Sequence, residues 1–228
     1  MKTLIAVPCM DVIHTKFVQA FERMAKPQGT TVAFIPNTLI YEARNSIAQN
    51  AVKEGFDRVL WLDSDMYMPW DAMIELHKTM DTGKDFVTAM YYRRKPPAYP
   101  VVCDEVEWKV HDNGVVETKA HSYTGYPICE VFEIGGSGFG CCMTSAALLK
   151  DMVEKYGVPF TPLMGMGEDL AFCWRARQHG WKLWCDSHIV CGHVGQHTYD
   201  YNDYFKAWDA MRKNKNNKPQ QSLHPIAP

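Results

Sequence analysis

The sequence predicts one α/β domain with a mixed, mostly parallel sheet flanked by helices. Short apolar runs alternate with helical segments through the first ninety residues. The chain has 228 residues and is 46% hydrophobic, enough for one sizeable core. One apolar run ends in Asp63 and Asp65, and open α/β sheets bind ligands where strands end.

The first part of the chain has the order strand, helix, strand, repeated to a fourth strand. Residues 40–53 carry Ile40, Ala43, Ile47 and Ala51 at helical spacing, and Pro69 suits the first position of a helix. This order favours a parallel sheet covered on both faces. We expect strands at 3–8, 30–35, 58–62 and 85–91, and helices at 14–25, 40–53 and from Pro69 to about Met80.

The pattern changes after residue 93, where four prolines and short alternating stretches favour antiparallel strands at 100–103 and 115–119. A glycine-rich segment at 135–140 leads into a predicted helix at 143–154. A further helix begins near Glu168 and ends before Gly180, and residues 181–185 form a closing strand. We therefore expect a domain over 1–212 and a disordered tail over 213–228, which is rich in Lys, Asn and Pro.

Composition limits the functions that the chain can have. A net charge of −2 and a pI near 6.5 give no footprint for duplex nucleic acid. No apolar run is long enough to span a bilayer, and the N-terminal one is too short for a signal peptide. Eight cysteines without a CxxC pair favour buried thiols, so we expect a cytoplasmic protein. A zinc site is an alternative, although its spacing matches no common module; it would comprise Cys185, Cys191, His193 and His197.

The aspartates at 63 and 65 are the first candidate site. If the chain stays extended there, both carboxylates point the same way. No Lys or Arg stands between them in sequence, so they should repel each other, and a divalent cation would resolve the repulsion.

Two cationic segments could contact phosphate. Arg44 and Asn45 lie early in a predicted helix, where a guanidinium fork and an amide could hold nucleotide oxygens; a solvated helix face is the alternative. Arg93 belongs to the run Tyr91-Tyr-Arg-Arg-Lys-Pro-Pro97, which suits phosphate or sugar contacts or is simply a basic surface loop.

Two further groups could complete a catalytic site. Glu168 and Asp169 open a helix; they could be capping residues, or one could act as general base for an acceptor hydroxyl. At a helix start, the pKa of Asp169 should favour the ionised form. His193 follows the last strand and could complete a metal shell begun by Asp65, with mixed oxygen and nitrogen ligands favouring Mn²⁺ over Mg²⁺.

In this order the motifs resemble the GT-A (Rossmann-like) glycosyltransferases, in particular the family 2-like group and its small bacterial and phage members. The resemblance covers about residues 3–197. Asp63-Ser64-Asp65 matches the DxD motif and Glu168-Asp169 the Glu-Asp pair. Further matches are His193, the pair Arg44 and Asn45, Pro8 at the end of the first strand, and the glycine-rich Gly136, Ser137 and Gly138.

The resemblance implies transfer of a sugar from a nucleoside diphosphate sugar, with UDP-sugars favoured, to an acceptor hydroxyl, with inversion of the anomeric centre favoured over retention. It assigns the metal, Mn²⁺ or Mg²⁺, to Asp65 and His193 with Asp63 nearby. Arg44 and Arg93 would face the diphosphate, and Asp169, paired with Glu168, would be the base.

The sequence also departs from this family, and two other functions stay open. Pro36-Asn37-Thr38 replaces the usual acidic residue after the second strand, and the QxxRW motif of processive synthases is absent. A nucleotidyltransferase of similar topology would usually carry a glycine-rich basic loop after the first strand, where Pro8-Cys-Met-Asp11 stands. A non-catalytic carbohydrate- or partner-binding module could use the seven tryptophans and eleven tyrosines for stacking.

Overall fold

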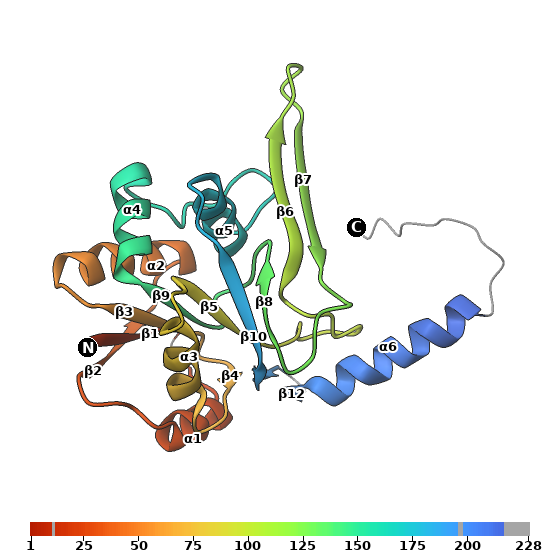
Figure 1. Ribbon diagram of the computed structural model, residues 1–228, viewed down its shortest axis with the longest axis horizontal. Coiled ribbons are helices and arrows are strands. Elements are labelled where there is room, and N and C mark those ends of the chain that lie inside the picture. The colour runs from red at the N-terminus through yellow and green to blue at the C-terminus, as the bar shows by residue number, and fades with distance from the viewer. Residues whose placement is uncertain (11, 196–197, 217–228) are drawn as a thin grey trace.

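A computed structural model describes residues 1–10, 12–195 and 198–216 (Figure 1). Its centre is a sheet of seven strands in the order β2-β1-β3-β9-β5-β10-β8. Strands β1, β2, β3, β5 and β10 run in one direction, and β8 and β9 run against them. The predicted fold class is confirmed. The strands are β1 (Thr3–Cys9), β2 (Thr30–Pro36), β3 (Arg58–Leu62), β5 (Phe86–Met90), β8 (Val131–Ile134), β9 (Cys141–Ser145) and β10 (Leu183–Val190).

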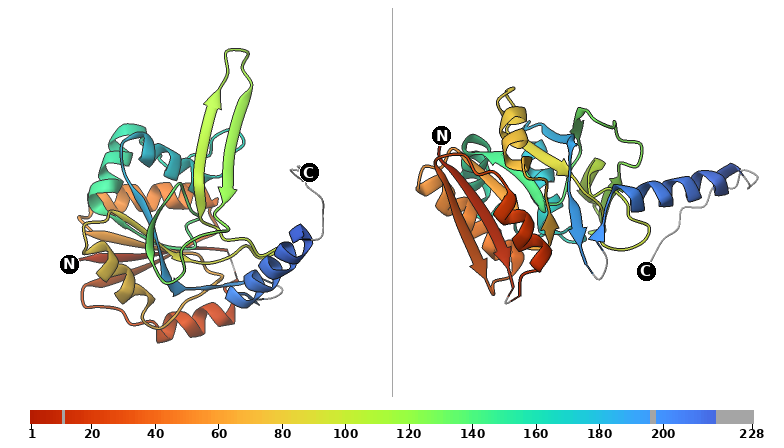
Figure 2. Two further views of the ribbon diagram at one scale, coloured as in Figure 1. Left: turned by 45° about the vertical axis from the view of Figure 1, so that its right-hand side comes forward. Right: turned by 90° about the horizontal axis from the view of Figure 1, so that it is seen from below.

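Helices cover both faces of this sheet (Figures 1 and 2). One face packs against α2 (Ile40–Lys53), α4 (Ala146–Tyr156) and α5 (Glu168–Gln178). The other packs against α1 (Thr15–Arg23) and α3 (Ala72–Met80). Because successive side chains of a strand point to opposite faces, a strand covered on both sides is largely apolar, which explains the hydrophobic run 59–62 of β3.

The central strand β9 was not predicted. Residues 141–145 were assigned in part to a helix, but they pair antiparallel with both β3 and β5, and α4 begins only at Ala146. The Ser145 hydroxyl accepts a hydrogen bond from the Leu148 backbone nitrogen at 3.1 Å and caps that helix. A short apolar run followed at once by a helix gives no periodicity that could separate the two elements.

Other boundaries also differ from the expectation. Pro69 lies in a turn before α3, whose first residue is Ala72. The proline-rich region forms a loop followed by a hairpin of β6 (Cys103–Val110) and β7 (Val116–Ser122), which stands away from the sheet (Figure 2). Helix α6 (Tyr201–Asn216) includes the first four residues of the expected disordered tail, and residues 217–228 lie outside the described part of the chain.

A second, smaller sheet brings the segment that follows β10 next to the turn that follows β3. Strand β11 (Gly192–Val194) pairs antiparallel with β4 (Met66–Tyr67) and with β12 (Thr198–Tyr199). His193 stands opposite Met66, and the Val194 backbone nitrogen donates to the Asp65 carbonyl at 2.7 Å. This pairing fixes His193 beside the turn that carries the two aspartates. Within the described residues, no helix has both the length and the apolar character that crossing a bilayer requires.

One buried hydrogen bond provides a test of the position of β9. The Trp61 indole nitrogen donates to the Thr144 hydroxyl at 2.9 Å, and both side chains are buried. Thr144→Val keeps the shape but leaves the indole N–H without a partner, so we expect a loss of about 1–3 kcal/mol in the free energy of unfolding, measured by chemical denaturation. Thr31→Val, on an exposed position of β2, should change it by less than about 0.5 kcal/mol. Equal effects of the two changes would contradict this placement.

Candidate functional site

Two adjoining cavities lie where the central strands end. The first, of about 510 Å³, is lined by the end of β1, the segment after β2 and the turn after β3. The second, of about 430 Å³, lies between that turn, the segment after β5 and the start of α5. Both are lined by Ile40, Asp63 and Asp65, so they form one continuous crevice with the aspartates at the junction.

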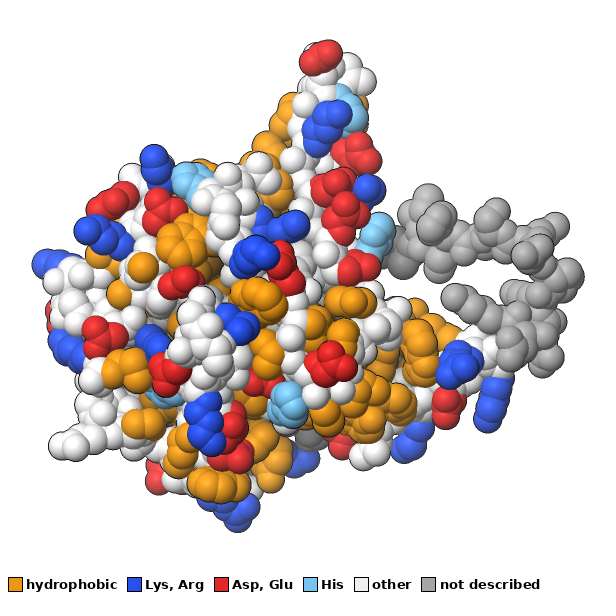
Figure 3. All heavy atoms as spheres, viewed as in Figure 1, with side chains coloured by type: hydrophobic (Ala, Val, Ile, Leu, Met, Phe, Trp, Pro, Cys, Tyr) orange, Lys and Arg blue, Asp and Glu red, His pale blue; other side chains and the backbone are white. Residues whose placement is uncertain are grey.

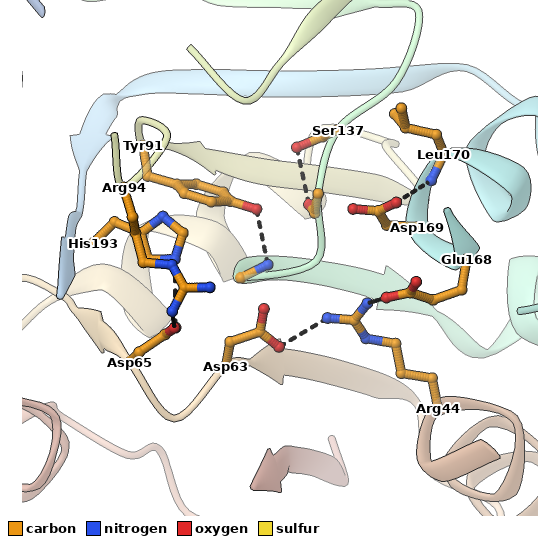
Figure 4. A network of polar contacts seen from close by, with 12 residues as sticks. Arg44, Asp63, Asp65, Tyr91, Arg94, Ser137, Glu168, Asp169, Leu170 and His193 are labelled. Atoms are coloured by element: carbon orange, nitrogen blue, oxygen red, sulfur yellow. Dashed lines mark hydrogen bonds and ion pairs between the residues drawn. The ribbon is translucent and has the colours of Figure 1, made fainter. Parts of the chain in front are cut away.

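Arg44 holds two of the predicted acidic residues in place. Its side chain is only 3% exposed and donates to Asp63 Oδ1 at 2.8 Å and to Glu168 Oε1 at 2.5 Å (Figure 4). The guanidinium also lies over the Phe139 ring, 5.4 Å from its centre. Burial raises the pKa of Asp63, although the charge of Arg44 opposes that shift. Arg44 is therefore committed to two carboxylates and does not offer the free fork that the sequence suggested for a diphosphate.

The two aspartates separate instead of pointing together. Strand β3 ends at Leu62, and the Met66 backbone nitrogen donates to the Asp63 carbonyl at 3.1 Å, closing a turn. Asp63 turns toward Arg44, whereas Asp65 Oδ2 accepts from Arg94 at 2.5 Å. The expectation of parallel carboxylates that lack cationic neighbours is wrong, because distant parts of the chain supply one arginine to each.

The Nε2 atom of His193 faces Asp65. Its Nδ1 lies 2.8 Å from the Tyr92 carbonyl, which can only accept, so Nδ1 carries the proton. In the neutral ring, Nε2 is then an acceptor, and it lies 3.5 Å from Asp65 Oδ1. That oxygen is buried and has no hydrogen-bond partner. Burial alone would raise the pKa of Asp65, but the positive charges of His193, in its protonated form, and of Arg94 outweigh it and hold the pKa below its ordinary value.

Asp169 stands at the far side of the second cavity. Its Oδ1 accepts from the Leu170 backbone nitrogen at 2.7 Å, and Oδ2 lies toward Gly138, where an added Cβ would be 3.4 Å from it. Burial, with the charge of Glu168 next, raises the pKa of Asp169 to about 6. The expectation that the helix start would keep this pKa low is wrong, because burial outweighs the helix dipole.

Three predicted binding residues do not line the crevice. The Asn45 side chain is buried and accepts from the Phe160 backbone nitrogen at 2.7 Å. Gly136 is packed, since a Cβ there would meet Val106 at 2.8 Å. Ser137 is buried, and its hydroxyl donates to the Gly138 carbonyl at 2.9 Å. These residues support the site from behind. The crevice is lined by the other predicted residues: Pro8, Arg44, Asp63, Ser64, Asp65, Arg93, Gly138, Glu168, Asp169 and His193.

Sequence reasoning missed several lining residues. Arg94 contacts Asp65, whereas only its neighbour Arg93 was singled out. The Tyr91 hydroxyl accepts from the Gly140 backbone nitrogen at 2.9 Å and closes the back of the second cavity. The basic run at 93–95 was the available signal for Arg94, but a loop has no periodicity to say which cation turns inward.

The positions of these side chains can be compared with the metal site expected from the sequence. Within the described residues, no group of three His, Cys, Asp or Glu side chains converges as a ready metal site. Asp63 is turned to Arg44, which leaves Asp65 Oδ1 and His193 Nε2 as the facing pair. The zinc alternative receives no support from Cys185 and Cys191, which are fully buried free thiols, and His197 lies outside the described residues.

Comparisons with known proteins show the fold. No protein-family model matches the chain, and no curated protein sequence does. The crystal structure of A197 from STIV superposes with a TM-score of 0.64 at 15% identity, covering 89% of this chain and 92% of that one. A protein described as a glucose-1-phosphate thymidylyltransferase from Bacillus anthracis, in complex with a sucrose, gives a TM-score of 0.40 at 9% identity, over 86% and 70% of the chains. The first likeness shows a shared α/β fold, and the second is too weak to carry an argument.

The raised pKa of Asp169 makes stability depend on pH. Because this pKa lies near 6, above the ordinary value of about 3.9, the folded state binds the proton more tightly than the unfolded chain. The free energy of unfolding should therefore fall as pH rises from about 4 to 6, by about 2 kcal/mol after allowance for the partly exposed side chain.

Asp169→Asn removes this titration. Its gain in stability over the parent protein should grow from pH 4 to 6 and then level off, as measured by denaturation at a series of pH values. Asp112→Asn, on the exposed hairpin, is the control and should show no such trend. A gain for Asp169→Asn that is independent of pH would refute the buried carboxylate.

Proposed function

We propose that the protein is a metal-dependent glycosyltransferase that moves a sugar from a nucleoside diphosphate sugar to an acceptor hydroxyl. The observation that carries this proposal is the order of groups along one crevice. A cavity whose described lining holds no lysine or arginine leads to the facing pair Asp65 and His193, and beyond them stands Asp169 with its pKa near 6. A nucleoside, a diphosphate and a sugar follow one another in the donor in the same order.

The first cavity suits a nucleoside. Pro8, Met10 and Ile40 offer apolar contact to a base, while Asn37 and Thr38 offer polar groups to its edges or to the ribose. Among the described residues that line it, none is a lysine or an arginine. The exposed cations of the crevice, Arg93, Arg94 and Lys95, line the second cavity, where the phosphates of a donor would lie.

Asp65 and His193 fit a divalent cation that arrives with its substrate. Two facing ligands, one oxygen and one nitrogen, leave other coordination positions for diphosphate oxygens and water, and the nitrogen favours Mn²⁺ over Mg²⁺. The hydrogen bond from His193 Nδ1 to the Tyr92 carbonyl orients the ring for this role. A bound cation would stabilise the negative charge that develops on the leaving diphosphate.

Asp169 is suited to take the acceptor proton. A carboxylate with a pKa near 6 is mostly ionised at neutral pH and is a stronger base than an exposed aspartate. Gly138 puts no side chain beside Oδ2, and a Cβ there would clash with the Tyr91 hydroxyl. One base opposite the leaving diphosphate supports direct displacement with inversion. A purely binding module would have no use for a buried carboxylate that lowers its stability.

The first experiment identifies the donor and then tests the base. A thermal-shift screen of nucleoside diphosphate sugars with Mn²⁺, UDP-sugars included, should give one stabilising donor. Asp169→Asn should then reduce release of nucleoside diphosphate about 10²–10⁴-fold while leaving donor affinity within about twofold. Asp112→Asn serves as control. Full turnover by Asp169→Asn would remove it as base, and release of pyrophosphate from a nucleoside triphosphate and a sugar phosphate would establish the nucleotidyltransferase instead.

A second variant tests the metal pair through Arg94. This arginine, whose side chain is 53% exposed, pairs with Asp65 in the free protein, and its charge competes with a cation for that carboxylate. Once released, it can pair with the diphosphate. Arg94→Ala should therefore bind Mn²⁺ up to about fivefold more tightly without nucleotide, and bind UDP more weakly at saturating Mn²⁺, as measured by calorimetry.

Lys78→Ala removes a similarly exposed cation on α3 and should change neither affinity. If Arg94→Ala weakened both or left both unchanged, Arg94 would not be the cation that competes for Asp65.

A further inference from the structure

A third cavity lies outside this crevice, in a groove between the projecting hairpin and α5. Its volume is about 610 Å³. Strand β6 contributes Glu107 and Trp108, β7 contributes Glu117, and the C-terminal half of α5 contributes Trp174, Arg177 and Gln178. Figure 1 shows the hairpin rising beside α5, well away from the helices on the opposite side of the sheet.

The groove is built on a fixed base. A small core cluster of Cys103, Val106, Met166 and Ala171 joins the hairpin to α5 and the turn before it. The Trp108 indole nitrogen donates to the Met164 carbonyl at 3.1 Å, which fixes the orientation of that ring. Because both walls rest on one core, the groove is formed before any ligand binds, and binding would lose little conformational entropy.

Two tryptophans give the groove its apolar surface. The rings of Trp108 and Trp174 meet edge to face, with centres 5.5 Å apart and an angle of 66° between their planes. Both are only partly buried. Indole rings in such positions bind the C–H faces of sugar rings, which are apolar, while the sugar hydroxyls reach outward to polar neighbours.

The polar groups around these rings balance in charge. Glu105, Glu107 and Glu117 are matched by Lys109, Arg177 and the neighbouring Lys119, whose ammonium lies 3.0 Å from Glu107 and 3.7 Å from Glu105. Figure 3 shows both signs interspersed over the hairpin. A groove without net charge has no reason to select an ionic ligand.

Two hydrogen-bond donors remain available in the groove. Neither the Arg177 guanidinium nor the Gln178 amide has a hydrogen-bond partner within the described part of the chain. Adjacent sugar hydroxyls both donate and accept, so they can satisfy these donors and the glutamate oxygens together. A proline-rich peptide would also stack on tryptophan, but it offers chiefly carbonyl acceptors and few donors for the glutamate oxygens.

We propose that this groove binds a neutral oligosaccharide, at a site separate from the donor crevice. Trp108 and Trp174 contact the sugar rings, and Arg177, Gln178 and the glutamates bind the hydroxyls. The proposal does not depend on glycosyl transfer; if transfer takes place, the groove holds glycan close to α5, whose first turn carries Asp169.

The test uses the full chain on an array of neutral and anionic glycans, without nucleotide or metal. The parent protein should bind neutral glycans, and Trp174→Ala and Arg177→Ala should each weaken that binding about tenfold or more. Trp70→Ala, which removes a 63% exposed tryptophan outside the groove, is the matched control and should bind like the parent.

Arg177→Ala leaves the small core untouched, so it keeps the test valid if Trp174→Ala folds poorly. Absence of binding to every neutral glycan, binding confined to anionic glycans, or full binding by Arg177→Ala would each overturn the proposal. Because no donor is present, such a failure would leave the transferase proposal standing.

Discussion

The buried guanidinium of Arg44 is the constraint on which the site depends. It comes from α2 and ties the end of β3, through Asp63, to the start of α5, through Glu168. A buried charge without partners would cost several kcal/mol, so the fold must bring both carboxylates to it. In each acidic pair of the sequence, one residue therefore pairs with Arg44 and the other does not. Asp63 and Glu168 form ion pairs with Arg44, while Asp65 and Asp169 line the crevice without pairing with that arginine.

This division explains the electrostatics of the crevice. Asp65 lies beside His193 and Arg94, which hold its pKa below the ordinary value and keep it a carboxylate. Asp169 forms no ion pair within the described part of the chain, and burial with the charge of Glu168 outweighs the opposing charge of Arg44 and brings its pKa to about 6. Two aspartates therefore differ in protonation behaviour because of their neighbours, which is what separate roles in metal binding and proton transfer would need.

Much of the fold could be predicted from the sequence because apolar residues recur at different spacings in strands and in helices. The bounds of α2 and β3 agree with the expectation, and those of β1 and α5 differ by only a residue or two. Strand β9 could not be found this way, because five apolar or small residues precede α4 without a break. The turn at Asp63 also escaped prediction, since its closure depends on β4 pairing with β11, about 125 residues further along the chain.

Most residues of the candidate site could be predicted from the sequence, but the directions of their side chains could not. That Asp65 and His193 lie close together was expected, and pairing of β4 with β11 is the reason. Asn45 and Ser137 were chosen as polar residues near a ligand, but each satisfies a backbone group inside the fold. The sequence shows that a side chain is polar, but it does not show whether that side chain bonds to the protein's own backbone or to a bound molecule.

The central claim is that Asp65 and His193 accept one cation together with a nucleoside diphosphate. Electron spin-echo spectroscopy of Mn²⁺ bound in the presence of UDP tests this most directly, because it detects nitrogen bonded to the metal. The account predicts an imidazole nitrogen coupling that disappears in His193→Ala. Mn²⁺ held by oxygen ligands alone, or a nitrogen coupling that persists in that variant, would contradict it.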